Sequence, residues 1–163
     1  MRKQPNSRDC FICGVHNEAG MKVDFYDVAT VDREPEVLAR FTGRSVHQGY
    51  PGRMHGGILT GILDEVIGRA INAARREDEP TIWGVAMELS TRFHHPVPLG
   101  VELTARGRLT RQRRRIFEGA GEIYLADGSV AVTAKGRYLE LALAEISAVD
   151  PAGLGWQVYP DER

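Results

Sequence analysis

The residues best placed to do chemistry are a His-Gly-Gly triplet, His55-Gly56-Gly57, and a carboxylate seven residues after its last glycine, Asp64. The glycines open an apolar segment with helical spacing. Their backbone N–H groups therefore stand at the positive end of a helix dipole, where a developing oxyanion can bind. A carboxylate two turns further along can face a group bound there and act as an acid or a base. Together these groups predict a site for acyl transfer.

Three glycines surround Asp64 on the predicted helix, which spans about residues 57–76. Gly57, Gly61 and Gly68 lie one or two turns from the carboxylate. Each glycine costs about 0.5–1 kcal/mol in a helix relative to alanine. Such a flank indicates that something approaches the helix backbone closely, which favours Asp64 as the reacting group. The alternative is a packing contact of the helix, with this carboxylate at a solvated edge.

Three neighbours of Asp64 are further candidates. Glu65 precedes Arg69 by four residues, so a surface ion pair is its expected role, with a contact to the substrate as the alternative. Thr60 lies one turn before the carboxylate and is a second candidate for a substrate contact. His55 stands just before the helix, where it either fixes the entering loop or donates a hydrogen bond to a substrate carbonyl.

The elements that must position these residues follow from the apolar pattern. Alternating apolar residues predict six strands, two before the helix and four after it: 21–27, 37–42, 83–93, 101–110, 115–125 and 129–141. The helix carries an apolar stripe from Leu59 to Ala74, and Asp127-Gly128 predicts a hairpin turn. The sequence therefore predicts an α+β domain in which one long helix packs on a curved antiparallel sheet.

Composition limits the class of protein. The 163 residues fit one domain, and 42% hydrophobic with 26% charged residues is typical of a soluble globular protein. A formal net charge of −1 argues against a dedicated nucleic-acid binder. No apolar run approaches the roughly 18 residues of a membrane span, and the N-terminus leads into no apolar signal core. A cytoplasmic protein without nucleic-acid or membrane partners is expected.

The segments around the triplet resemble a known family. Hot-dog-fold acyl-CoA thioesterases of the PaaI type have a signature similar to residues 47–65, HQGYPGRMHGGILTGILDE. The strand that follows the helix in that family resembles residues 88–100, ELSTRFHHPVPLG. An N-terminal element found in some members resembles CFICG at residues 10–14, with Asn17 and Gly20. The resemblance spans roughly residues 10–140.

The resemblance implies a hot-dog fold, in which a long central helix is wrapped by a curved antiparallel sheet of about five or six strands. It also implies homodimers, often paired into homotetramers, with the acyl-CoA site at the dimer interface. In the family, the backbone N–H at the position of Gly57 polarises the thioester carbonyl. The carboxylate at the position of Asp64 acts from the neighbouring subunit as general base or nucleophile. Coenzyme A is then part of the substrate, and no separate cofactor is expected.

The family also implies helper groups. An amide side chain in the loop before the triplet, which orients water or the carbonyl in some relatives, corresponds to Gln48. A hydroxyl residue on the strand that faces the helix falls at Ala86 in this sequence. If that hydroxyl normally holds the water, either Ser90 or Thr91 replaces it or slow hydrolysis is expected.

Two further motifs could carry chemistry. The basic run over residues 111–115 lies at a predicted turn, where Arg114 is expected to contact the phosphates of coenzyme A. A solvated hairpin tip is the alternative. Cys10, Cys13 and His16 have the spacing of three zinc ligands, but a closed structural site needs four. A packed N-terminal turn without metal is therefore expected.

The expected organisation is an N-terminal extension over 1–20 packed on the domain, a hot-dog domain over 21–145 and an irregular tail over 146–163. Hydrolysis of a CoA thioester is the leading function. A hydratase or dehydratase of the same fold is disfavoured, because these enzymes carry a histidine further along the helix and none follows Asp64 there. A non-hydrolytic acyl-CoA binding or sensor protein is the alternative from another class.

Overall fold

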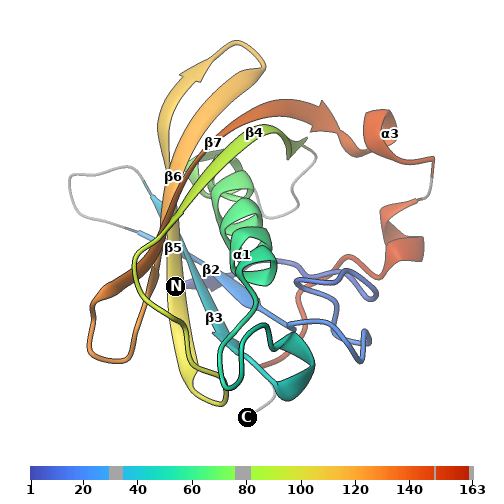
Figure 1. Cartoon of the computed structure of the whole chain (residues 1–163). Helices are drawn as coiled ribbons and strands as arrows, with labels where there is room; N and C mark the ends of the chain where they lie inside the picture. The colour runs from blue at the N-terminus through green and yellow to red at the C-terminus, as the bar shows by residue number, and fades with distance from the viewer. Residues whose placement is uncertain (30–34, 76–81, 149, 162–163) are drawn as a thin grey trace.

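The computed structural model describes residues 1–29, 35–75, 82–148 and 150–161 (Figure 1). Its strands are β1 (Arg2–Lys3), β2 (Asp24–Val28), β3 (Glu36–Thr42), β4 (Ile82–Phe93), β5 (Glu102–Arg113), β6 (Ile116–Tyr124) and β7 (Val130–Ala142). Within these ranges the strands form one seven-stranded sheet in the order β1-β2-β3-β5-β6-β7-β4. Neighbouring strands are antiparallel throughout. The α+β architecture is confirmed, with more strands than the five or six expected because β1 adds to the β2 edge.

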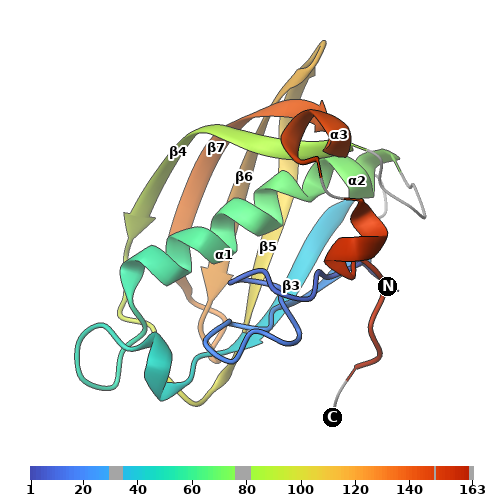
Figure 2. The same cartoon turned by 90° about the vertical axis from the view of Figure 1, so that its right-hand side faces the viewer.

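The predicted helix is present as two segments on one bent axis, α1 (Gly56–Gly68) and α2 (Ala70–Arg75). At the bend, the Arg69 N–H still donates to the Glu65 carbonyl at 3.0 Å, so the chain turns without leaving the helical path. The sheet curves around the helix (Figure 2), and the predicted apolar stripe packs into the hydrophobic core. Its buried members on α1 are Leu59, Ile62, Leu63, Val66 and Ile67.

The helix backbone packs directly on β5. Leu103 and Ala105 are buried on the inner face of that strand, as its alternation predicts. Gly107 continues the same face, and a Cβ there would lie 2.4 Å from the Val66 carbonyl oxygen. A larger residue would therefore push the helix off the sheet. The predicted turn between β6 and β7 is also confirmed, with Gly128 at a positive φ of 83°.

The N-terminal segment adds backbone contacts that strand patterns alone do not reveal. The Met21 N–H donates to the Phe11 carbonyl at 2.8 Å, and the Val23 N–H donates to the Ile12 carbonyl at 2.9 Å. These bonds hold Met21 and Val23 outside β2, which begins at Asp24 and so later than expected.

Short helical turns complete the fold: η1 (Ser45–His47), α3 (Leu143–Ile146) and η2 (Pro151–Leu154). One of these turns, η2, lies within the segment 146–163 that was expected to be irregular, and α3 ends at the first residue of that segment. Among the described residues, no helix has the length and apolar character needed to cross a membrane.

Candidate functional site

Helix α1 begins at the His-Gly-Gly triplet, as predicted. His55 is the N-cap residue, and its Nδ1 accepts a hydrogen bond from the Gly57 N–H at 3.0 Å. The Gly56 N–H stands at the first helical position, where no acceptor within the helix can reach it. Gly57 is exposed and Gly56 is half-buried. The helix start is therefore accessible to a ligand, but an oxygen that takes the Gly57 N–H must replace the imidazole.

A buried histidine that the sequence analysis did not single out holds the loop before the triplet. His47 is fully buried, its Nδ1 accepts from the Arg44 N–H at 3.0 Å, and its carbonyl accepts from the His55 N–H at 2.9 Å. In the same loop, the Oε1 of Gln48 accepts from the Gly52 N–H at 2.8 Å. The side-chain oxygen of Gln48, the expected helper amide, is therefore already hydrogen-bonded within its own loop.

Asp64 lies half-buried in the middle of α1, and its carboxylate accepts a hydrogen bond from the sheet. The Tyr138 hydroxyl donates to Asp64 Oδ1 at 3.1 Å, and the same hydroxyl lies 3.2 Å from the Asp64 carbonyl oxygen. Burial raises the pKa of Asp64 above its ordinary value, and the hydrogen bond from Tyr138 offsets part of that rise. A carboxylate with a raised pKa is a better general base than an ordinary surface carboxylate.

Tyr138 was not among the predicted site residues. Its ring is fully buried and stacks on Phe117, with the ring centroids 5.0 Å apart. The register of β4 and β7 sets Tyr138 opposite Ala86. The family resemblance implies a hydroxyl at the position of Ala86 on β4. Here the hydroxyl that bonds to the Asp64 carboxylate is that of Tyr138, on the neighbouring strand β7. Strand alternation places Tyr138 on the inner face, but only the pairing register shows that it meets Asp64.

The expected substitute hydroxyls do not pair with Asp64. Ser90 is exposed and lines a separate cavity of about 470 Å³ with Glu118 and Lys135. The Oγ1 of Thr91 is buried and has no hydrogen-bond partner in the described part of the chain. Thr60 is half-buried one turn before Asp64. Neither expected substitute hydroxyl is hydrogen-bonded to the carboxylate, whereas Tyr138 is.

Protein atoms lie beside each of the three glycines around Asp64, and a Cβ at Gly57 would lie 3.1 Å from the Nδ1 of His55. A Cβ at Gly61 would lie 3.0 Å from the Cδ1 of Ile12. A Cβ at Gly68 would lie 3.3 Å from the Gly84 carbonyl oxygen. Other segments of the chain therefore do approach the helix backbone closely. At Gly61 and Gly68 the missing side chain makes room for packing within the chain, not for a ligand.

Glu65 and Arg69 form the expected ion pair, with 2.8 Å between Oε2 and Nε. The expectation of a surface pair was wrong, because Arg69 is only 6% exposed. Its guanidinium lies over the Phe25 ring at 4.1 Å, and its Nη1 donates to the Pro5 carbonyl at 2.8 Å. The pair therefore attaches the N-terminal segment to the helix next to Asp64.

The cysteine motif meets Glu65 instead of the expected histidine. Among the described residues, the ligand atoms of Cys10, Cys13 and Glu65 lie within 4.8 Å of one another, and His16 is not part of that group. Both cysteines are free, and the Cys10 thiol lies 3.6 Å from Glu65 Oε1. The expectation that no metal binds stays a prediction.

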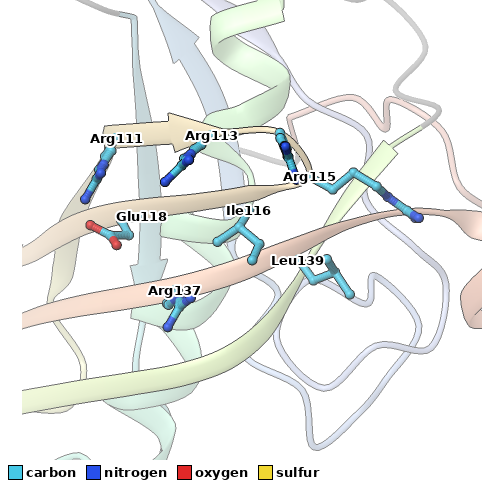
Figure 3. Close-up of a pocket in the computed structure, with 8 residues that line it drawn as sticks. Arg111, Arg113, Arg115, Ile116, Glu118, Arg137 and Leu139 are labelled. Atoms are coloured by element: carbon cyan, nitrogen blue, oxygen red, sulfur yellow. The ribbon is translucent and has the colours of Figure 1, made fainter.

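The basic run lines a cavity of about 540 Å³ on the β5–β6 hairpin (Figure 3). Arg114 occupies the hairpin turn with a positive φ of 55°. The charged residues of the lining are five arginines and one glutamate: Arg111, Arg113, Arg114, Arg115, Arg137 and Glu118. Such an excess of guanidinium groups suits a phosphate ligand. Arg137 was missed because it comes from β7, where the register sets it opposite Glu118.

The comparisons with known proteins place this architecture in a family. The model of the thioesterase superfamily matches residues 51–132, which include the triplet, Asp64 and β4 to β6. The chain belongs to the thioesterase superfamily. A search of curated proteins finds no match.

Several solved structures share the fold. A thioesterase superfamily protein is 31% identical, with a TM-score of 0.69, and the match covers 81% of this chain and 63% of that protein. This chain therefore spans less than two thirds of that relative. The PaaI protein of E. coli, from the phenylacetic acid degradation operon, matches at 18% identity and a TM-score of 0.60 over 72% of this chain and 80% of its own. A Streptococcus mutans protein bound to acetyl CoA matches at 16% identity and 0.60 over 72% and 89%. The predicted hot-dog fold is confirmed.

In this superfamily member, the two predicted chemical groups lie well apart along one helix. Gly57 and Asp64 are seven residues apart on one helix, which at 1.5 Å per residue is roughly 10 Å along the axis. An oxyanion donor must lie about 3 Å from the carbonyl oxygen, whereas a base can act through one water molecule. The separation along the axis is therefore larger than the reach of a single hydrogen bond.

Proposed function

We propose that this chain hydrolyses acyl-CoA thioesters at a site shared between two subunits. The observation that carries the proposal is Asp64, a half-buried carboxylate with a raised pKa and a hydrogen bond from Tyr138. It lies on a helix whose N-terminus presents the His-Gly-Gly triplet. Membership of the thioesterase superfamily supports this reaction, and the similar Streptococcus mutans protein is bound to acetyl CoA.

In the proposed reaction, the thioester oxygen binds at the start of α1. The Gly57 N–H, released from His55, stabilises the negative charge that develops on this oxygen, and the adjacent Gly56 N–H adds a second donor. Asp64 of the other subunit takes a proton from water, whose oxygen attacks the carbonyl carbon. The C–S bond then breaks, and the leaving thiolate recovers that proton. Direct attack by Asp64, followed by hydrolysis of an anhydride, is the nucleophilic form of the same proposal.

Replacement of Asp64 by asparagine tests this function. Asn can still accept the hydrogen bond from Tyr138, so the fold should persist while the base is lost. We expect thiol release from acyl-CoA esters to fall roughly 10²- to 10⁴-fold in kcat. Asp127→Asn, at an exposed carboxylate in the β6–β7 turn, is the control and should leave the rate unchanged. Unchanged turnover in Asp64→Asn would reject the assignment.

One observation favours a second candidate, a non-hydrolytic acyl-CoA binding protein. His55 holds the Gly57 N–H in this conformation, so the proposed oxyanion donor is already engaged. Calorimetry separates the two candidates. Tight binding of CoA esters without release of free thiol by the wild-type chain would support the binding protein, and release of thiol would support the enzyme.

The arginine-lined cavity is proposed to hold the phosphates of coenzyme A. Arg114→Ala and Arg137→Ala should each raise KM for an acyl-CoA roughly three- to tenfold with little change in kcat, since phosphate contacts bind ground state and transition state alike. The same acyl group on pantetheine, which lacks the nucleotide, should show no such change. Arg106→Ala removes an exposed arginine paired with Glu36 and serves as control. An equal rise in KM for the CoA and the pantetheine thioesters would show that the phosphates bind elsewhere.

A further inference from the structure

The N-terminal turn brings two thiols against a carboxylate on helix α1. The ligand atoms of Cys10, Cys13 and Glu65 all lie within 4.8 Å of one another, the only group of three or more possible metal ligands in the described part of the chain. The Cys10 Sγ lies 3.6 Å from Glu65 Oε1, and both cysteines are free. Ligand atoms from two segments far apart in the sequence therefore come together here.

Glycines on both segments make this approach possible. The Gly14 N–H donates to the Cys10 carbonyl at 2.8 Å, and a Cβ at Gly14 would lie 2.2 Å from that oxygen, so only glycine fits the turn there. A Cβ at Gly61 would lie 3.0 Å from the Cδ1 of Ile12. Because Gly61 and Glu65 lie four residues apart on one helix face, the turn that approaches Gly61 places its cysteines beside the carboxylate.

The surroundings of Cys10 suit a thiolate. The backbone N–H groups of Ile12 and Cys13 point to its Sγ, at 3.3 Å and 3.4 Å. A cysteine that only fills space packs among apolar groups, whereas N–H donors stabilise a negative charge on sulfur. A thiolate that faces the Glu65 carboxylate needs a cation between the two groups. A proton serves in the metal-free chain, and a metal ion can replace it.

The spacing of the ligand atoms matches tetrahedral zinc. Zinc binds thiolate sulfur at about 2.3 Å and carboxylate oxygen at about 2.0–2.2 Å. Two such ligands at the tetrahedral angle are about 3.6 Å apart. The Cys10 Sγ and Glu65 Oε1 are separated by 3.6 Å. Thiolate ligands also favour zinc over magnesium or calcium, which take oxygen ligands.

The charges around the three ligands balance those of a zinc ion. Arg69 donates from Nε to Glu65 Oε2 at 2.8 Å, which fixes the carboxylate while Oε1 faces the Cys10 thiol. Two thiolates and one carboxylate carry three negative charges, and Zn²⁺ with the Arg69 guanidinium carries three positive ones. A neutral cluster avoids the cost of uncompensated buried charge.

The group can be reached from solvent on one side. Cys13 is buried, but Cys10 is half-buried and the Glu65 side chain is 27% exposed. An ion can therefore enter between the Cys10 and Glu65 side chains, and a water molecule can take the fourth position of the tetrahedron.

We propose that Cys10, Cys13 and Glu65 bind one zinc ion, which attaches the N-terminal turn to helix α1 beside Asp64. Two Zn–S bonds and one Zn–O bond form, and both thiol protons pass to solvent. No metal was expected from the sequence, because a closed site needs four protein ligands. Three protein ligands and one water also satisfy zinc. The proposal goes beyond the thioesterase function, since no step of that reaction uses the ion.

Metal titration of the reduced, metal-free protein tests the site. We expect about one Zn²⁺ per chain in competition with a chromophoric chelator, and Co²⁺ in its place should give sulfur-to-cobalt charge-transfer absorption. Cys10→Ser and Cys13→Ser should each weaken zinc binding roughly 100-fold or more and reduce that absorption. Glu65→Gln keeps an oxygen for Arg69 and should weaken binding roughly 10- to 100-fold.

His16→Ala is the matched control, because His16 is exposed and lies outside the group although it shares the motif's spacing. It should bind zinc as tightly as the wild type. Zinc should also raise the Tm of wild type and His16→Ala, and much less that of the ligand variants, since only the folded chain brings the ligands together. Tm values measured without zinc report whether each variant folds.

Three outcomes would overturn the proposal. The first is a reduced wild-type chain that binds no zinc, or far less than one ion per chain. The others are full affinity in Glu65→Gln and lost affinity in His16→Ala, because each shows a different set of ligands. None of these measurements depends on thiol release from CoA esters, so the zinc site and the thioesterase function stand or fall separately.

Discussion

Asp64 and Tyr138 form the pair on which the proposed chemistry depends. The carboxylate is half-buried, so burial raises its pKa above the ordinary value of 3.8, while the tyrosine hydroxyl stabilises the ionised form and lowers it in part. The active form of a general base is the ionised one. The rate should therefore rise with pH through the pKa of this carboxyl.

The pH dependence of the reaction provides a prediction at this scale. The acid limb of kcat/KM should lie at a pH above 3.8. Tyr138→Phe keeps the ring that stacks on Phe117 but removes the hydrogen bond, and should move that limb to still higher pH. pH–rate profiles of the two proteins measure the shift. An acid limb that moves to lower pH, or does not move, would show that the hydroxyl does not stabilise the ionised carboxylate.

The same pKa has a consequence for stability, with a defined sign. Because the folded-state pKa is raised, the folded protein binds this proton more tightly than the unfolded chain does. The resulting stabilisation is present at low pH and is lost as pH rises through the folded-state pKa. Asp64→Asn removes the dependence, so its Tm relative to wild type should increase over that pH range. A constant difference in Tm would contradict the raised pKa.

At the scale of elements, the start of α1 combines a structural cap with a proposed binding site. His55 accepts the Gly57 N–H, a bond that stabilises the helix and also occupies the proposed oxyanion donor. His55→Ala should lower the free energy of unfolding by about 0.5–2 kcal/mol, the cost of losing a cap. His55→Asn, whose side-chain oxygen can cap, should recover most of it. Chemical denaturation measures both values.

The activity of the same two variants separates capping from chemistry. If His55 only caps the helix, both variants retain thiol release, because the Gly57 N–H stays available to the substrate. A large loss of kcat in the stable His55→Asn protein would instead assign the imidazole a part in the reaction.

Elements set by local pattern were predictable from sequence, whereas contacts set by register were not. The helix, its apolar stripe and the Gly128 turn follow from periodicity and turn chemistry. Tyr138 and Arg137 both lie on β7. Tyr138 contacts Asp64, and Arg137 lies beside the arginines of the β5–β6 hairpin, because of the register in which β7 pairs with β4 and β6. Strand pairing is long-range, and alternation gives only the face of each residue.

The burial of Arg69 was missed for a related reason. Its spacing from Glu65 indicates an ion pair, but the segment that covers that pair lies more than sixty residues earlier, at Gln4 and Pro5. Helical spacing predicts which side chains face each other and carries no information about what packs over them.

At the scale of the whole molecule, the separation of Gly57 and Asp64 bears on how many chains make one site. The groups stand roughly 10 Å apart along α1, which is more than a single hydrogen bond spans. The proposed homodimer brings both groups to one carbonyl by pairing the helix start of one subunit with the carboxylate of the other. A symmetric dimer then holds two equivalent sites.

Complementation between two inactive variants tests the shared site. Gly57→Pro removes the N–H donor at a first-turn position where proline fits a helix, and Asp64→Asn removes the base. Each homodimer should be inactive. A heterodimer purified through two different tags has one site with both defects and one with neither, so about half of the wild-type rate should return. The wild-type/Gly57→Pro heterodimer should also have about half the rate, which controls for misfolding of the proline variant. If each site lay within one chain, every site of the Gly57→Pro/Asp64→Asn heterodimer would carry a defect, and it would stay inactive.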